Sequence, residues 1–457
     1  MKNSSIKFMV VVSLWLAWTG PLVFGPLAFA QTEADLADIP RGSLTLEQVF
    51  TMAVAANPDI LAAKQRIHEA VAVLKQAKSA YLPTVSLKGS VKALDTTVQP
   101  DWAPEFRINE SFNEAGAALE MVWLLFDGFA RKANTLAAAH GVEQRKQTVA
   151  ETRRLLFKAV ATAFYQAQLA VEGMVVARQN QEFNQTLERD SRIRWEVGTV
   201  AESEMLNFSV KALQAESDYR TARRDFKVVK TVLAQLLALP DSFLPEDLYP
   251  VRISRSQQTP VVGFHEDLEF ALDHRPDLKA LDQGILAMKQ RLTAQKGTLY
   301  PKIALITGAD YLYQENITVI DQEEHDTYVG IVAAWDLYTG GRRGGKIEEI
   351  NSQIRTLDHE RAKLVLAISS AVRQSRDRAE AAFDIYERQQ KTLEMIQRIR
   401  DHVEMAYRAG TLSLTRLNEV QTDLVRASGA VAATWIDYRM ALVDLMAETG
   451  RIDTLLE

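Results

Sequence analysis

The stretch Trp335-Asp336-Leu337-Tyr338-Thr339-Gly340-Gly341-Arg342-Arg343 marks the point where an alternating apolar segment ends and a long helical pattern begins. A second stretch, Trp123-Leu124-Leu125-Phe126-Asp127-Gly128-Phe129-Ala130-Arg131, repeats its Trp, aromatic, Gly and Arg positions at an offset of 212 residues. A long internal repeat constrains the architecture before any chemistry is considered. These two stretches therefore predict a tandem duplication, and Gly128, Gly340 and Gly341 are expected to form the turns between strand and helix.

The repeat extends towards the N-terminus. Asn57-Pro58-Asp59 matches Arg275-Pro276-Asp277, and Tyr81-Leu82-Pro83 matches Leu299-Tyr300-Pro301, both at an offset of 218 residues. Because the offset falls to 212 at the tryptophans, the intervening segment must contain a loop of variable length.

Proline positions divide the chain in the same way. Residues 105–239 and 302–457 contain no proline, and proline breaks interior helical turns. Long helices are therefore expected there. The expected organisation is a signal peptide at 1–30, a first repeat at 31–239, a linker at 240–262 with prolines at 240, 245, 250 and 260, and a second repeat at 263–457.

Residues 1–30 have the features of a secretory signal peptide. Lys2 and Lys7 precede an apolar core, and Ala28-Phe29-Ala30 gives the small-residue pattern of a cleavage site. An uncleaved anchor is the alternative, but Thr19-Gly20-Pro21 interrupts the apolar run. We expect cleavage after Ala30 and export of the mature chain.

Charge and cysteine content limit the possible partners. Loss of two lysines with the signal peptide changes the formal net charge from −6 to −8, a mild balance that gives no reason to expect a nucleic-acid partner. The chain has no cysteine, so disulfides, thiolate metal sites and a lipid-bearing cysteine are excluded.

Two β-hairpins are expected, at about residues 81–126 and 299–338. Val85, Leu87 and Val91 alternate with polar residues in the first, and Val329 and Ile331 share one face in the second. Each strand is expected to have about ten residues, the length of a tilted strand that crosses a bilayer. Residues 96–112 and 314–327 are expected to form loops at the tips. A soluble four-stranded sheet packed on helices is the alternative.

Four strands cannot close a membrane barrel, and an open edge cannot face lipid because its amide groups would lack partners. Closure requires other copies: a dimer would give eight strands and a trimer twelve, and only the larger barrel leaves a broad aqueous lumen. Trp123 and Trp335 would then lie in the aromatic belt at the lipid–water boundary.

Two helical hairpins are expected, at about 129–239 and 341–449. Their first helices, about 65 residues long, would extend roughly 100 Å. One seam of apolar and small residues spaced four and three apart suits a two-stranded coiled coil, whereas two adjacent seams, as found here, suit a helix that contacts a neighbour on each side. One such seam comprises Leu156, Val160, Ala163, Ala167, Ala170 and Met174, with Ile368, Val372, Ser375, Ala379, Ala382 and Tyr386 as its partners in the second repeat.

Each long helix is expected to end at a glycine and turn back. Gly198 and Gly410 are positioned as C-terminal caps, and the Thr or Ser residues that follow, Thr199, Thr411 and Ser413, are expected to cap the returning helices.

These features together resemble the TolC-like outer-membrane factor family, the outer membrane efflux proteins. The resemblance covers essentially the whole mature chain and is carried by Tyr81-Leu82-Pro83, Phe126-Asp127-Gly128, Tyr300-Pro301, Leu337-Tyr338-Thr339-Gly340-Gly341 and the two Gly-Thr turns. It implies a mainly α protein with membrane β-structure: a homotrimeric, twelve-stranded barrel in the outer membrane of a Gram-negative bacterium, continued by a twelve-helix periplasmic tunnel.

The resemblance also implies partners and a gate. A periplasmic adaptor would dock on the helix-turn tips, and an inner-membrane transporter of the RND, ABC or MFS class would lie below. Family members close the tunnel with acidic residues six and nine positions beyond the second tip glycine, which are Arg416 and Glu419 here. Only the second keeps the acid. Glu202 and Glu204 are the first repeat's candidates, and a ring of acids would favour cations. Two alternatives to a gate remain. In one, the charges of Glu202, Glu204 and Glu419 only solvate a helix surface; in the other, Arg416 forms an ion pair with an acid of a neighbouring helix.

Enzymatic interpretations find little support. Residues 340–346 match the start of a phosphate-binding loop, but Ile347 stands where Ser or Thr should hold magnesium. The seven histidines form no metal-binding motif, and no nucleophile-elbow motif is present. We therefore expect no enzymatic activity and no cofactor.

The expected function is a passive outer-membrane exit duct of a tripartite efflux or type I secretion system. A periplasmic coiled-coil adaptor or a structural protein without a pore is the alternative, although an adaptor would have one helical hairpin and no membrane-like strands. The sequence leaves the substrate open among drugs, metals and proteins.

Overall fold

The computed structural model describes residues 43–98, 105, 108–239, 242–244, 249–250, 263–315 and 322–452. Residues Arg41–Glu457 form one structural unit. The predicted signal peptide and most of the predicted linker lie outside the described residues.

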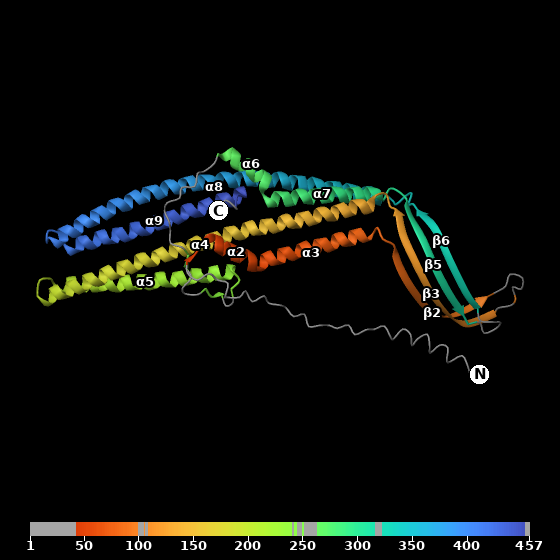
Figure 1. Ribbon diagram of the computed structural model, residues 1–457, viewed down its shortest axis with the longest axis horizontal. Helices are drawn as coiled ribbons and strands as arrows, with labels where there is room; N and C mark the ends of the chain where they lie inside the picture. Colours follow the sequence, from red (N-terminus) through yellow and green to blue (C-terminus); the bar gives the residue numbers. More distant parts are fainter. Residues whose placement is uncertain are drawn as a thin grey trace, which may run out of the picture. The chain divides into compact units, whose positions relative to one another are not determined.

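The same order of elements occurs twice along the chain (Figure 1). The first set is β1 (Ser43–Leu44), α2 (Leu46–Ala56), α3 (Pro58–Ser79), β2 (Thr84–Val98), β3 (Ile108–Phe126), α4 (Ala130–Glu196) and α5 (Glu202–Leu236). The second set is β4 (Tyr249–Pro250), α6 (Phe264–His274), α7 (Pro276–Gly297), β5 (Lys302–Gln314), β6 (Gln322–Ala334), α8 (Arg342–Arg408) and α9 (Leu414–Thr449).

The long helices α4 and α8 begin where the sequence places them, directly after the strand-to-helix turns. Each has 67 residues, which at ~1.5 Å per residue corresponds to roughly 100 Å. Figure 1 shows α3 and α7 beside the half of each long helix nearest the sheet, and α5 and α9 beside the far half. Helix α4 packs against α3, α5, α7 and α9, while α8 packs against α6, α7 and α9.

The predicted helical seam is buried over most of its length. In α4, Leu156, Val160, Ala163 and Ala167 are buried, and in α8 the matching Ile368, Val372, Ser375 and Ala379 are buried as well. Alanine and serine at these positions bring neighbouring helices close together. Ala170, Ala382 and Met174 are half-buried. Among the described helices, none has the length and apolar composition needed to cross a bilayer.

The four long strands form one antiparallel sheet in the order β2-β3-β5-β6. They have 15, 19, 13 and 13 residues, so the expectation of about ten residues is wrong. The difference arises at the tips, where Asp95 pairs with Ser111 and Asp310 with Asp326. A backbone ladder needs no apolar side chains, so pairing continues past the apolar segment into residues that were expected to form loops.

Equivalent contacts join equivalent positions in the two repeats. Trp123 Nε1 donates to the carbonyl oxygen of Tyr81 at 2.9 Å, and Trp335 Nε1 donates to that of Leu299 at 3.1 Å. Asn57 Nδ2 donates to the carbonyl of Leu236 at 3.5 Å, and Arg275 donates to that of Glu448 at 3.2 Å. The sequence offsets therefore correspond to spatially equivalent sites.

Candidate functional site

The two faces of the sheet differ in chemistry. Val85, Val91, Val329 and Ile331 lie on one face with exposed fractions of 64% to 75%. On the other face Lys88 pairs with Glu120 at 2.7 Å and Lys92 with Glu114 at 3.0 Å. A hollow of about 440 Å³ on the polar face is also lined by Asp310, Glu324 and Asp326. One exposed apolar face and one charged face suit a wall between lipid and water.

Arginine side chains form hydrogen bonds at the junctions between strand and helix. Arg131 donates to the carbonyl oxygens of Leu124 and Leu125, and Arg343 donates to that of Asp336. Arg131 also pairs with Asp127 at 3.3 Å. Because each guanidinium bonds a backbone carbonyl at or just beyond the end of a strand, it helps to fix the direction in which the following helix begins.

Gly128 makes the closest backbone approach at these junctions. Its φ is +66°, and a Cβ built there would lie 2.3 Å from the carbonyl oxygen of Gly297, at the end of α7. Gly340 and Gly341 also have positive φ values, but a Cβ built at either position would have nothing within 4 Å. In the first repeat, Phe129 takes the left-handed conformation with φ +67°, where the second repeat has Gly341.

The helical tips close with the same hydrogen bonds. Gly198 and Gly410 both have φ +75°. The amide of Thr199 donates to the carbonyl of Arg194 at 2.8 Å, and that of Thr411 donates to the carbonyl of Ala406 at 2.9 Å. These bonds satisfy carbonyls that the ends of α4 and α8 leave free.

Ser413 caps α9, since its side chain accepts from the amide of Arg416 at 3.4 Å. The expectation that Thr199 and Thr411 cap the returning helices is wrong. Their hydroxyls instead donate back to the carbonyls of Arg194 and Ala406, because the turn places them above the end of the preceding helix. Ala201 holds the N-cap position of α5 and provides no side-chain cap.

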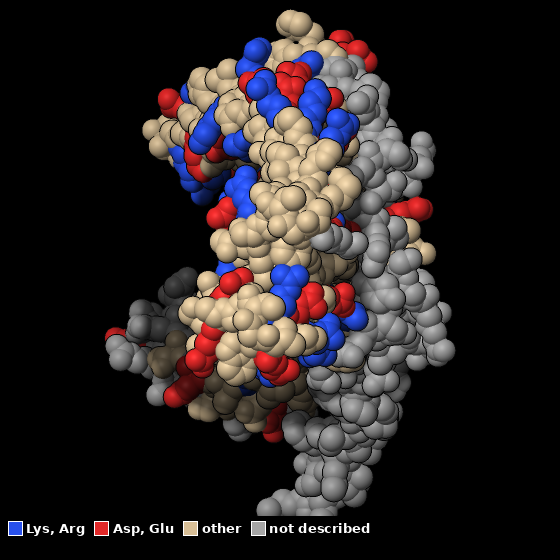
Figure 2. All heavy atoms as spheres, turned by 90° about the vertical axis from the view of Figure 1, so that its left-hand side faces the viewer, with Lys and Arg blue, Asp and Glu red and all other residues tan. Residues whose placement is uncertain are grey.

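The candidate gate residues lie just beyond the tips. Arg416 pairs with Glu419 of the same helix at 2.9 Å, with side chains 56% and 55% exposed. The sequence left open whether Arg416 pairs with an acid of a neighbouring helix; within one chain it pairs with Glu419 of its own helix. Glu202 and Glu204 occupy the first turn of α5, where carboxylates interact favourably with the helix dipole. Figure 2 views this end of the molecule and shows both signs of charge interspersed around it.

A further contact joins the two hairpins near the tips. The guanidinium of Arg194, near the end of α4, lies 5.1 Å from the ring of Tyr407, near the end of α8. Burial raises the pKa of Tyr407; the charge of Arg194 opposes this shift, and the charges of Asp190 and Glu204 add to it. Among the described residues its buried hydroxyl has no hydrogen-bond partner. Tyr407 also packs against an apolar cluster to which α4, α5, α8 and α9 all contribute. The cluster comprises Leu187, Phe208, Val403, Leu414, Leu417 and Val420.

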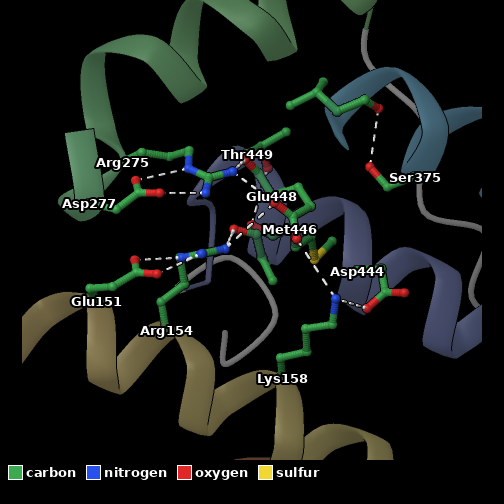
Figure 3. A network of polar contacts seen from close by, with 12 residues as sticks. Glu151, Arg154, Lys158, Arg275, Asp277, Ser375, Asp444, Met446, Glu448 and Thr449 are labelled. Atoms are coloured by element: carbon green, nitrogen blue, oxygen red, sulfur yellow. Dashed lines mark hydrogen bonds and ion pairs between the residues drawn. The ribbon is translucent and has the colours of Figure 1, made fainter. Parts of the chain in front are cut away.

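A buried ionic network lies where α4, α7 and the end of α9 meet (Figure 3). Glu448 pairs with Arg275 at 2.7 Å and lies 3.8 Å from Arg154. Arg154 is held by Glu151 at 2.7 Å, and Arg275 is held by Asp277 at 2.7 Å. Both arginine side chains are nearly inaccessible to solvent. The network ties the end of α9 to α4 of the first repeat and α7 of the second.

Asp277→Asn is expected to lower the melting temperature at neutral pH, and the loss should shrink in acid. Burial alone would raise the pKa of Asp277, but the hydrogen bonds and charge of Arg275 and the charge of Arg154 lower it below its usual value. A depressed carboxyl pKa contributes stability that is present above the unfolded-state value of about 3.9 and is lost as the pH falls through the folded-state value. Circular dichroism melts across this pH range measure the effect. An equal loss at every pH would contradict it.

Comparison with known proteins places the chain in a family. A profile of the outer membrane efflux proteins matches residues 49–239 and 268–451. The chain belongs to the outer membrane efflux protein family. It is 25% identical over 383 residues to the outer membrane efflux protein BepC of Brucella suis, covering 82% of this chain and 78% of BepC. It is 22% identical over 427 residues to the protein CyaE of Bordetella pertussis, covering 90% of this chain and 84% of CyaE.

The fold agrees with that of solved family channels. The crystal structure of the Campylobacter jejuni CmeC outer membrane channel matches with a TM-score of 0.75 at 14% identity, covering 89% of this chain and 85% of CmeC. This outer membrane efflux protein is therefore an outer-membrane channel of an efflux or secretion system that extends into the periplasm. The predicted family is confirmed, and so is the prediction of an outer-membrane channel of an efflux or secretion system.

Sequence reasoning located the tips and the junction glycines but missed three features. Gly297, at the end of α7, allows the close backbone approach of Gly128, and nothing in the surrounding sequence indicates this role. Tyr407 could have been suspected as an aromatic residue three positions before the tip glycine. No sequence signal joins Arg154 to Glu448, because nearly 300 residues separate them. No cluster of three or more potential metal ligands occurs in the described part of the chain.

Proposed function

We propose that three copies of this chain form a passive exit duct of a tripartite efflux or type I secretion system. The observation that carries the proposal is a four-stranded sheet with an exposed apolar face, a charged face and two open edges. In the described residues, β2 and β6 each pair along one side only. Open edges are incompatible with lipid, so neighbouring copies must complete the ladder. Three copies give twelve strands, enough for a water-filled lumen.

The helices support the same assembly. Leu206, Val210 and Leu213 form an exposed apolar row on α5, and Met395 and Ile399 form another on α8. Spacings of three and four residues place each row on one helix face. Helices α5 and α8 lie on opposite sides of the α4–α9 contact, so the rows are available to different neighbours. We infer that they close a twelve-helix tunnel between copies, with Trp123 and Trp335 at the membrane boundary.

Current recordings in planar lipid bilayers test the duct directly. The purified mature protein should produce discrete, long-lived conductance steps that need no energy source, because an aqueous lumen conducts ions passively. Insertion without any conductance would contradict the proposal and favour a structural role without a pore.

The tips are the proposed docking site for a periplasmic adaptor that connects the duct to an inner-membrane transporter of the RND, ABC or MFS class. Gly198, Thr199, Gly410, Thr411 and Ser413 shape two turns at the same end of the helices, beside the exposed apolar side chains of Val197 and Leu412. The transported substrate is a separate question, because a passive lumen needs no specific pocket.

Arg416→Ala is expected to increase cation selectivity, and Glu419→Ala to decrease it. In a single chain Arg416 Nη1 and Glu419 Oε2 form an ion pair at 2.9 Å, so their charges compensate each other. Removal of the arginine would leave three carboxylates around the axis of a trimer, and a ring of acids attracts cations. Reversal potentials under a salt gradient measure the change. Arg220→Ala, which breaks an exposed pair on α5, is the matched control. Unchanged selectivity in both gate variants would remove the gate assignment.

Arg194→Ala is expected to raise the open probability of the channel. The guanidinium-to-ring contact with Tyr407 joins the two hairpins, and a partly desolvated contact of this kind stabilises by about 1 kcal/mol. Its loss should shift a closed-to-open equilibrium by roughly five-fold. Single-channel recordings measure the open fraction. Arg178→Ala, which breaks the exposed ion pair with Glu182 elsewhere on α4, is the control. An open fraction equal to that of the wild type would show that this contact does not latch the tips.

A further inference from the structure

Within one chain the first repeat packs against the second, and these contacts show what a neighbouring copy would contact. Helix α4 packs against α7 and α9 of the second repeat, and strand β3 pairs with β5. In the described residues, the counterparts α8 and β6 pack mainly against elements of their own repeat. The far side of the second repeat is therefore free to make, with another copy, the contacts that the first repeat makes within the chain.

The two hairpins pair in the same register. Thr84 lies opposite Val122 in the first hairpin. The sequence offsets of 218 and 212 residues convert these positions to Lys302 and Ala334, which lie opposite each other in the second hairpin. The offsets that relate the sequences of the repeats therefore also relate the backbone pairing of their strands, and they can be applied to the pairing between the repeats.

The same offsets predict how β6 pairs with β2 of a neighbouring copy. Between the repeats, Leu119 of β3 lies opposite Ala309 of β5. Their counterparts are Ile331 on β6 and Val91 on β2. Both side chains are exposed on the apolar face of the sheet. Placing them opposite each other continues that face across the seam, because directly opposite residues of an antiparallel ladder point to the same side.

This register also covers the open edge. It places residues 324–334 of β6 opposite residues 88–98 of the neighbouring β2, which is almost the full length of β6. Unpaired amide and carbonyl groups are costly in lipid, so a register that pairs nearly the whole edge is favoured.

On the helices, a charged contact between the repeats corresponds to two leucines. Arg154 of α4 lies 3.8 Å from the carboxylate of Glu448 on α9. At the offset of 212 residues, their counterparts are Leu366 on α8 and Leu236 at the end of α5. Leu366 is 71% exposed in one chain, and Leu236 is half-buried. Because both members are apolar, contact between copies would bury Leu366 without leaving a charge unpaired.

The junction between strand and helix departs from this correspondence. Gly128 lies against Gly297 between the repeats, and the counterparts are Gly340 and Ser79. A Cβ at Gly297 would lie 2.8 Å from the carbonyl oxygen of Gly128, so Ser79 cannot approach Gly340 as closely. Two copies must therefore lie slightly farther apart at this point than the two repeats do.

We propose that copies of this chain associate through an interface that repeats the contact between the two halves of one chain. Ile331 of one copy lies opposite Val91 of the next, and Leu366 packs against Leu236. The inference rests on the trimer proposed above and adds to it the strand register and the helix contact of the seam. A second copy fits this surface because it carries the same strand edge and helix faces that the second repeat offers to the first.

Disulfide cross-linking of the full mature protein tests the register, and the chain has no native cysteine to interfere. Ile331→Cys is combined in turn with Leu87→Cys, Gly89→Cys, Val91→Cys or Ala93→Cys. We expect the Val91 pair to give covalent dimers and trimers on non-reducing gels, because directly opposite Cα atoms lie within disulfide range. The other pairs should give at least about ten-fold less product, since diagonal positions lie ~7–8 Å apart or more.

An exchange of charge tests the helix contact. Leu366→Arg should lower the trimer fraction in native mass spectrometry, because the new guanidinium would be buried without an acid. Leu366→Arg combined with Leu236→Glu rebuilds the charged contact of the repeats and should restore the trimer. Leu155→Arg is the control: this leucine is exposed on α4, whose neighbours on both sides belong to the same chain, so the trimer fraction should stay unchanged.

Two results would overturn the inference while native mass spectrometry still showed a trimer, and would leave the proposed duct intact. One is strongest cross-linking at a position other than Val91, and the other is a folded Leu366→Arg protein that is as trimeric as the wild type. A folded wild-type protein that remains monomeric would refute the duct as well. If the first cysteine pair fails to fold by circular dichroism, Val329→Cys with Ala93→Cys replaces it, because these positions are opposite in the same register.

Discussion

Gly128→Ala is expected to prevent stable folding of the junction between sheet and helices. The new Cβ would lie 2.3 Å from the carbonyl oxygen of Gly297, and the residue would keep a φ of +66°. Both clashing partners are backbone, so neither can move aside without displacing a helix or a strand. Overpacking and left-handed strain together should cost at least about 3 kcal/mol. Heat-induced loss of helical circular dichroism, and the yield in outer-membrane fractions, measure the effect.

Two other glycines serve as matched comparisons for this prediction. Gly297→Ala should be destabilising as well, because its Cβ would lie 2.8 Å from the carbonyl oxygen of Gly128. Gly344→Ala, inside α8 with nothing within 4 Å of the new Cβ, should be neutral or stabilising by about 0.5–1 kcal/mol. If Gly128→Ala melted as the wild type does, the close approach would be refuted as a determinant of the fold.

Glu448→Leu is expected to lower stability by about 3 kcal/mol, because it removes a carboxylate shared by two buried guanidiniums. Arg275 would lose its 2.7 Å ion pair, and Arg154 would lose a carboxylate 3.8 Å away. Each arginine keeps one other acid, Asp277 and Glu151 respectively, so the network is weakened rather than abolished. Thermal melts followed by far-ultraviolet circular dichroism measure the loss.

Glu394→Leu provides the control for this second prediction. Glu394 pairs with Arg398 at 2.6 Å on α8, but both side chains are largely exposed. Exposed pairs contribute less than about 1 kcal/mol. Equal melting temperatures for the Glu448 and Glu394 variants would contradict a structural role for the buried network.

The sequence was most informative where a local rule acts without competition. Proline-free segments and the turn glycines predicted helices from Ala130 to about Trp195 and from Arg342 to about Tyr407, and the structure has Ala130–Glu196 and Arg342–Arg408. Helix periodicity and glycine caps depend on neighbouring residues, which a sequence displays directly.

Prediction failed where the outcome depends on partners distant in the chain. Strand ends are set by ladder pairing, so Ser111 and Asp326 are in strands although they were expected to lie in loops. The sequence suggested that the hydroxyl of Thr199 caps the following helix, but the turn geometry directs it to the carbonyl of Arg194. The pairing of Arg154 with Glu448 follows from the packing of α4 on α9, which no local pattern encodes.

Neighbouring copies must close the open sheet if this protein is to form a membrane duct. Native mass spectrometry of the mature protein, purified in detergent and released from its micelles, tests this most directly. We predict one species with the mass of three chains, because three sheets complete a twelve-stranded barrel without open edges. A folded protein that remains monomeric, or that has the mass of two chains, would contradict the account.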